Sequence, residues 1–255
     1  YMQREEKYCY IEDYFRFRRL VQLLHLDSKA SLSFENNDPS LKLVILNEEE
    51  ADEVSDHLLE NFFPFEPLAM HLQLNLEDEI RPWLRSLISH QLSQGLSVGL
   101  RDQLNENLLV GVSVNEDVTR NQNEITMKSC ITEDYSKMKQ IIHMINLLYD
   151  SEDMLDVLEV ERAIHICMVS VKQEYGGQGI AKRLLEHTET LAADKGIIAF
   201  FAEATGNYSA AAFIKKGFKI FKELPYKEYE FNGEKPFGDM KKHNALRLVT
   251  KKLKI

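Results

Sequence analysis

The sequence predicts an α/β fold in which a twisted, mixed β-sheet is flanked by helices. Three observations support this prediction. Residues 161–171 form an apolar, β-branched run typical of a buried central strand. A glycine-rich turn leads from this run into a helix over residues 179–195, and a strand over 197–203 precedes a second helix over 208–216. Strands that alternate with helices in this way indicate a sheet covered by helices.

The elements before this region follow from local signals. Residues 41–46 are expected to form a strand, and a helix follows over 47–61, with Asn47 as its N-cap and three glutamates at the positive end of its dipole. A loop with two prolines over 62–70 precedes an amphipathic helix over 77–94, for which Pro82 offers a local start.

The remaining elements complete the predicted sheet. Two antiparallel strands, over 97–104 and 108–118, are joined by the turn Asn105-Glu106-Asn107. A polar loop over 119–130 and a helix over 133–149 come next. The last strands are expected from Phe218 onward and over residues 244–250.

Length and composition limit the organisation of the chain. The break Asn36-Asn37-Asp38-Pro39-Ser40 separates residues 1–40, which are expected to be an N-terminal helix or arm, from one domain over residues 41–255. The net charge of −10 argues against nucleic acid or a membrane as a partner. Three scattered cysteines, the lack of an apolar run of about 18 residues and an N-terminus unlike a secretion signal together predict a cytoplasmic protein. Whether it is a monomer or a dimer is left open.

The turn after the central strand has the character of a phosphate site. Gly176, Gly177 and Gly179 let backbone N–H groups approach a ligand, and the helix that begins there adds its positive dipole end. A P-loop would need Gly-Lys-Ser/Thr at the end of the motif, but Ile180 and Ala181 follow Gly179. The eight histidines show no HExxH or comparable spacing, so no metal site is expected.

Two blocks of sequence resemble the GCN5-related N-acetyltransferase (GNAT) superfamily. The segment Gly176-Gly177-Gln178-Gly179-Ile180-Ala181 resembles motif A, Arg/Gln-x-x-Gly-x-Gly/Ala, with Gly176 in place of the usual Arg or Gln. The segment from Asn207 to Phe218 resembles motif B, in which an Asn opens a helix that Gly-Phe closes. The resemblance implies the GNAT fold, with strands splayed near Val171 to hold acetyl-CoA.

The same resemblance implies which residues bind acetyl-CoA. The backbone of Val169 and Val171 would pair with the pantetheine arm, and Asn207 would lie near its thiol end. The pyrophosphate would be surrounded by the residues of the glycine turn and the start of its helix, namely Gly176, Gly177, Gln178, Gly179, Ala181 and Lys182.

A second resemblance concerns the segment Glu66-Pro67-Leu68, which is similar to an acidic segment of the insect arylalkylamine N-acetyltransferases. It implies Glu66 as general base, assisted by the hydroxyls of Thr205 and Ser209. The residues agree, because a carboxylate within an aromatic, proline-containing run is partly desolvated, which raises its pKa. The implied reaction is acetyl transfer from acetyl-CoA to the primary amine of a small arylalkylamine (dopamine, serotonin, octopamine or tryptamine class) by direct attack in a ternary complex.

Two alternatives remain open at this point. The same fold and chemistry could act on polyamines or other aliphatic amines. A non-catalytic module that binds a CoA thioester is the other alternative, because Gly176 departs from motif A and Phe213 stands where many members carry a Tyr.

Overall fold

The computed structural model describes residues 39–120, 136–150 and 152–254, all of which belong to one compact unit that extends from Pro39 to Ile255. The helix or arm predicted within residues 1–40 and the predicted loop beyond Arg120 lie outside the described residues. Within these ranges seven strands form one sheet in the order β1-β2-β3-β4-β5-β7-β6. The strands are β1 (Leu41–Ile45), β2 (Val98–Asp102), β3 (Leu108–Thr119), β4 (Arg162–Val171), β5 (Ala199–Ala204), β6 (Lys219–Pro225) and β7 (Ala245–Lys252).

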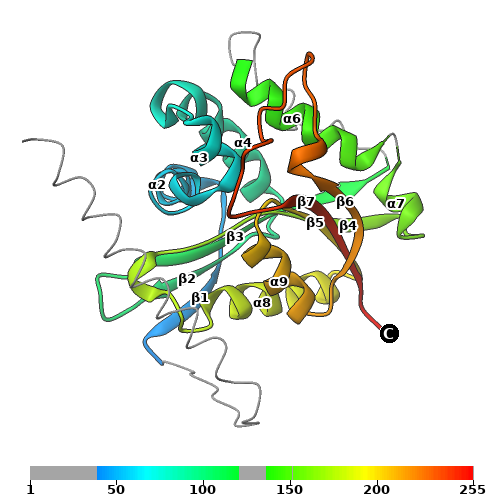
Figure 1. Ribbon diagram of the computed structural model, residues 1–255. Coiled ribbons are helices and arrows are strands. Elements are labelled where there is room, and N and C mark those ends of the chain that lie inside the picture. Colours follow the sequence, from blue (N-terminus) through cyan, green and yellow to red (C-terminus); the bar gives the residue numbers. More distant parts are fainter. Residues whose placement is uncertain (1–38, 121–135, 151, 255) are drawn as a thin grey trace, which may run out of the picture. The chain divides into compact units, whose positions relative to one another are not determined.

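Helices cover both faces of this sheet, as predicted (Figure 1). One face is covered by α2 (Ala51–Asn61), α3 (Pro67–Leu72), α4 (Arg81–Ser93) and α6 (Ser136–Tyr149), and the other by α8 (Ile180–Asp194) and α9 (Asn207–Lys215). A short helix, α7 (Met154–Val157), follows α6. Single turns of 3-10 or π helix occupy Glu48–Glu50, Phe63–Phe65, Leu76–Ile80, Gln173–Tyr175 and Tyr226–Glu228.

Helix starts follow from the capping residues. The predicted N-cap Asn47 is confirmed, because its side-chain oxygen accepts from the Glu49 N–H at 2.9 Å while its own N–H donates to the Glu50 carboxylate at 2.9 Å. The helix predicted over 77–94 begins with a π turn, and its α-helical part starts at Arg81, next to Pro82.

Two short helices differ from the sequence expectation. Residues 62–70, predicted as a loop, contain a 3-10 turn and most of α3, and α7 was not predicted. Helices of four to six residues are too short to show a helical periodicity. Pro64 stands in the 3-10 turn and Pro67 opens α3. In the first turn of a helix the N–H group that a proline lacks would have no partner within the helix, so no hydrogen bond is lost.

The register of β4 opens the sheet. β4 pairs with β3 from Thr119–Arg162 to Gly111–Val171, but it pairs in parallel with β5 only at Ile164–Phe200 and His165–Phe201. β5 continues instead along β7 as far as Ala204. The two strands therefore separate after His165, earlier than Val171, and leave one edge of β4 without a strand partner in the described part of the chain.

A β-bulge coincides with this separation. Val114 of β3 pairs with Met168 and Asn115 pairs with Ile166, so Cys167 is an extra residue on β4. A bulge bends its strand and increases the local twist, and bulges are common beside active sites. The bulge thus turns the end of β4 away from β5.

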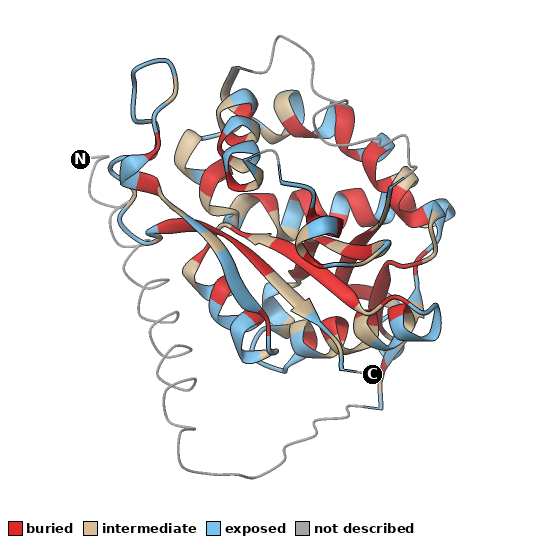
Figure 2. Cartoon of the chain, turned by 90° about the vertical axis from the view of Figure 1, so that its right-hand side faces the viewer, coloured by how far each residue is buried: buried red, intermediate tan, exposed pale blue. Residues whose placement is uncertain are grey.

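The core lies in separate clusters on the two faces of the sheet. The larger packs residues of α2, α4 and α6 against β3 and β4, and another packs α8 and α9 against β4, β5 and β7. Figure 2 shows the strands buried between helices that expose their outer sides. Over the residues that the structure describes, no helix has the length and apolar character needed to cross a bilayer.

Candidate active site

A cavity of about 690 Å³ lies between the central strands and the helices of one face. Its walls come from β3, β4 and β5, from the segments of α3, α4, α6 and α7, and from the start of α9. Among the sequence-predicted site residues it brings together Glu66, Thr205, Ser209 and Val169. Because Val169 belongs to the part of β4 beyond its pairing with β5, the cavity reaches the gap between these strands.

The lining is aromatic and acidic. Rings contributed by Phe62, Phe63, Tyr149, Phe201 and Phe213 share the wall with five carboxylates, those of Glu66, Glu116, Glu152, Asp153 and Glu203. Within the described residues Arg120 is the only arginine or lysine of this lining, and it forms ion pairs with Asp153, Asp156 and Glu161. The cavity therefore suits a cation that carries an apolar group.

Glu66 enters this cavity from the start of α3. One carboxylate oxygen, Oε2, accepts a hydrogen bond from the Ala69 N–H at 2.6 Å, which caps the helix. The other oxygen, Oε1, is buried without a hydrogen-bond partner among the described residues. Burial raises the pKa of Glu66, and the Ala69 N–H and the Thr205 hydroxyl offset part of this rise. The expected desolvation is confirmed, although Phe65 contributes little to it, since it is 51% exposed.

Two hydroxyl residues, Thr205 and Ser209, line the same cavity as Glu66. Pro67 packs close to Gly206, which brings the Glu66 segment beside Thr205. Ser209 lies one turn into α9, where its hydroxyl donates to the Gly206 carbonyl at 3.0 Å and accepts from the Gly206 N–H at 3.2 Å. Phe213 lines the same wall and is buried.

The predicted phosphate turn lies at the start of α8, outside the lining of the cavity. Gly179 is the N-cap of α8 with φ +75°, and a side chain there would meet no atom within 4 Å. The side of Gly179 on which a Cβ would project therefore borders open space. Gly176, the departure from motif A, has a local cause, since a Cβ would lie 2.9 Å from the Gln173 carbonyl oxygen. The neighbouring residues Gly177, Gln178 and Lys182 are exposed, and Ala181 is half-buried.

The other predicted cofactor residues lie in two places. Val169 and Val171 lie on the part of β4 that pairs with β3 but no longer with β5. Both are half-buried and pack on the face of the sheet that α8 covers. Asn207 opens α9, but its side chain is engaged in the fold, because its amide donates to the Lys242 carbonyl at 3.1 Å and its oxygen accepts from Arg247 at 3.2 Å. It is not part of the cavity lining.

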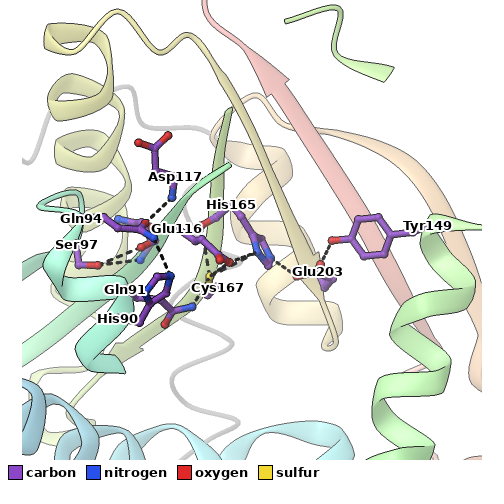
Figure 3. A network of polar contacts seen from close by, with 11 residues as sticks. His90, Gln91, Gln94, Ser97, Glu116, Asp117, Tyr149, His165, Cys167 and Glu203 are labelled. Atoms are coloured by element: carbon purple, nitrogen blue, oxygen red, sulfur yellow. Dashed lines mark hydrogen bonds and ion pairs between the residues drawn. The ribbon is translucent and has the colours of Figure 1, made fainter. Parts of the chain in front are cut away.

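A polar network in the cavity was missed by the sequence analysis (Figure 3). His165 lies between Glu116 and Glu203, with Nε2 2.7 Å from a Glu203 oxygen and Nδ1 3.5 Å from a Glu116 oxygen. Tyr149 donates to the second oxygen of Glu203, and the His165 ring stacks on Phe201 at 4.7 Å. Burial raises the pKa of Glu203 to about 7. The sequence offered one signal for this network, because Glu116, His165 and Glu203 each interrupt a largely apolar strand. Polar side chains at such positions indicate a part of the sheet that lines a site.

The comparisons with known proteins agree with this geometry. The model of the acetyltransferase (GNAT) family matches residues 129–218, a span that contains the splayed strand, the glycine turn, α8 and α9. The structure of arylalkylamine N-acetyltransferase 2 from Aedes aegypti is similar with 26% identity and a TM-score of 0.75, over 86% of this chain and 100% of that one. Residues 129–218 therefore carry a GNAT acetyltransferase domain.

Two further solved structures share the fold of this chain. Mosquito arylalkylamine N-acetyltransferase like 5b is 21% identical with a TM-score of 0.70, over 84% of this chain and 100% of that one. The polyamine N-acetyltransferase of Drosophila melanogaster, which forms N-acetylagmatine, is 18% identical with a TM-score of 0.70 over the same shares. The chain therefore has the fold that the resemblance to motifs A and B implied.

Proposed function

We propose that this GNAT acetyltransferase transfers the acetyl group of acetyl-CoA to the primary amine of a small arylalkylamine, by direct attack in a ternary complex. The observation that carries the proposal is Glu66, a carboxylate with a raised pKa. One of its oxygens has no hydrogen-bond partner among the described residues, and Glu66 lies in a cavity with aromatic walls that reaches the gap between β4 and β5. The two halves of the reaction have separate support.

The gap supports binding of the acetyl donor. The free edge of β4, at Val169 and Val171, offers backbone groups to which the amides of a pantetheine arm can hydrogen-bond as an added strand would. Open space in front of Gly179 and the N-terminus of α8 suits the pyrophosphate. Lys182 is exposed one turn into the helix and adds a positive charge.

The cavity supports the acceptor half. An alkylamine is mostly protonated at neutral pH, so a base must accept a proton before or during attack. We assign this role to Glu66, acting through water. The amine nitrogen then attacks the thioester carbonyl carbon, the C–N bond forms, and the C–S bond breaks with sulfur as the leaving group. We assign Ser209 to protonate or hydrogen-bond the departing thiolate, with Thr205 holding Glu66 and its water.

The lining supports an arylalkylamine in particular. The rings around the cavity suit an arene or a cation, and the excess of carboxylates attracts an ammonium group. The second candidate is an aliphatic amine such as a polyamine. It is favoured by one observation, the presence of carboxylates at Glu116 and Glu203 in addition to Glu66. Further cationic groups on one substrate could pair with these acids.

A thiol-release assay with acetyl-CoA and a panel of dopamine, serotonin, histamine and spermidine tests the proposal. We expect kcat/KM for dopamine and serotonin to exceed that for spermidine by about tenfold or more, a difference of ~1.4 kcal/mol in transition-state binding. A preference for spermidine would replace the arylalkylamine with the aliphatic alternative. Binding of acetyl-CoA without thiol release on any amine would instead support the non-catalytic module.

A further inference from the structure

We propose that Glu116, His165 and Cys167 form a binding site for one divalent metal ion of the zinc class on the wall of the cavity. Glu116 on β3 and His165 on β4 are directly paired across the two strands, and the bulge adds Cys167 beside them. Their potential ligand atoms lie within 4.8 Å of one another. The site is therefore built on rigid sheet backbone, and nothing in the linear spacing of these residues indicates it.

The distances fit a tetrahedral ion. Nδ1 of His165 lies 3.5 Å from Oε2 of Glu116 and 3.6 Å from Sγ of Cys167, and Sγ lies 4.0 Å from the same Glu116 oxygen. Tetrahedral zinc with bonds of about 2.0–2.3 Å sets its ligand atoms roughly 3.3–3.7 Å apart. Three ligand atoms thus need to move by no more than about half an ångström, which side-chain rotation supplies.

The outer partners of these residues match those of known metal sites. His165 uses its second ring nitrogen, Nε2, to contact the Glu203 carboxylate at 2.7 Å, and Tyr149 donates to that carboxylate in turn. Gln91, which is only 2% exposed, donates its side-chain N–H to Sγ of Cys167 at 3.2 Å. A histidine ligand held by a carboxylate and a thiolate that accepts an N–H are the arrangements that orient metal ligands (Figure 3).

The local charge also calls for a cation. Glu116 is 8% exposed, and in the part of the chain that the structure describes both Glu116 and Glu203 form ion pairs only with His165. Glu116 is buried and Glu203 is half-buried, and holding two carboxylates beside one shared histidine carries a desolvation cost. The charge of a divalent ion would balance those of the Glu116 carboxylate and the Cys167 thiolate, whose proton is released to solvent, while neutral His165 keeps its contact with Glu203.

The ligand set selects the class of metal. A thiolate and an imidazole favour Zn²⁺ and similar transition metals over Mg²⁺ and Ca²⁺, which prefer oxygen ligands. All three residues line the cavity, so a fourth position faces open space and would hold water or a ligand atom. This is a site with three protein ligands and one exchangeable position.

Metal titration of the full chain, freed of metal with a chelator, tests the site without reference to acetyl transfer. We expect one equivalent of Co²⁺ to bind with a thiolate-to-cobalt absorption band, Zn²⁺ to displace it, and Mg²⁺ to have no effect. Calorimetry in buffers of different ionisation enthalpy is expected to detect release of the thiol proton. Absence of stoichiometric Co²⁺ and Zn²⁺ binding would overturn the proposal.

Variants assign the binding to these residues. Cys167→Ser and the nearly isosteric Glu116→Gln are expected to weaken Zn²⁺ binding at least tenfold, and Glu203→Gln to weaken it by about tenfold through His165. His187→Gln is the control, since His187 lies on α8 outside the cluster. Circular dichroism identifies a variant that fails to fold, and the remaining folded variants then show whether the metal binds at these residues. Undiminished binding in the folded variants would place the metal at other cysteines and overturn the proposal.

Discussion

At the scale of single residues, Glu66 is both the N-cap of α3 and the carboxylate that we assign as general base. As the cap of α3 its Oε2 is fixed by the Ala69 N–H, so the carboxylate cannot rotate out to solvent. The other oxygen is buried and has no partner in the part of the chain that the structure describes, which leaves an acceptor position for an incoming amine proton or a water. The cap thus orients the group that we assign as base, and burial adjusts its pKa.

Replacement of this carboxylate tests the assignment. Glu66→Gln keeps the shape and can still cap α3, but it cannot accept a proton, so we expect kcat to fall roughly 10²-fold with acetyl-CoA binding retained. In the wild type kcat/KM is expected to decline as the pH falls through the raised pKa of Glu66, because protonation removes the base. The variant is expected to lose that limb of the profile.

The control for this prediction is Glu49→Gln, which removes an exposed carboxylate from the turn before α2. It is expected to leave the kinetics and their pH dependence unchanged. Equal activity of Glu66→Gln and the wild type across the pH range would exclude Glu66 from proton transfer.

His57 provides a prediction about stability. It is 4% exposed on α2, with Nε2 3.1 Å from the Ser170 hydroxyl, and burial lowers its pKa from 6.5 to about 4. The unfolded chain binds a proton near pH 6.5 that the folded chain resists until about pH 4. The contribution of His57 to the free energy of unfolding is therefore expected to fall by about 3 kcal/mol from pH 6.5 to pH 4 and to be constant above pH 6.5.

Urea unfolding at several pH values measures this effect. His57→Gln keeps a polar side chain that does not titrate, so between pH 6.5 and pH 4 the wild type is expected to lose about 3 kcal/mol of unfolding free energy relative to this variant. The same pH dependence in both proteins would show that His57 is not the group responsible.

At the scale of elements, the separation of β4 from β5 decides where a ligand can bind. A bulge at Cys167 bends β4, and beyond His165 its edge toward β5 has no strand partner among the described residues. The turn that follows leads into the N-terminus of α8. A fully paired strand would have its hydrogen-bonding groups satisfied and would offer none to CoA. The irregularity of the sheet is thus the feature that makes a site.

Two glycines at opposite ends of α8 offer a matched test of the turn. Gly179 and Gly196 both have φ +75°, and an added Cβ at either would meet no atom within 4 Å. Alanine at each position is expected to cost about 1 kcal/mol of stability through backbone strain. Only Gly179→Ala is expected to raise KM for acetyl-CoA, by about tenfold, because its methyl group points into the space assigned to the pyrophosphate.

Thermal unfolding and steady-state kinetics of the two variants measure these effects. An equal KM for acetyl-CoA in Gly179→Ala and Gly196→Ala would move the pyrophosphate away from the turn.

Elements were predictable where the pattern was long. The strand over 161–171 and the helix over 179–195 agree with β4 and α8 within a few residues, because apolar periodicity and glycines mark them. The helix α3 was missed because it has six residues. The point of separation was also misplaced, since pairing with β5 depends on tertiary contacts and on the bulge at Cys167, which no local pattern marks.

At the scale of the whole molecule, the site joins segments that are distant in sequence. Glu66 and Thr205 meet because α3 and the end of β5 face the same cavity, and the sequence alone suggested this only through a family resemblance. Glu116, His165 and Glu203 come from three strands, and their contact follows from strand order and register. Residues that act through cross-strand contact carry no linear motif, so sequence reasoning missed them.

The central claim is that the gap between β4 and β5, together with the glycine turn, binds CoA. Isothermal titration calorimetry of the full chain with CoA tests it most directly. We expect one molecule bound per chain with a dissociation constant in the micromolar to millimolar range usual for enzyme substrates. No heat of binding at CoA concentrations of a few millimolar, in more than one buffer and at two temperatures, would contradict the claim.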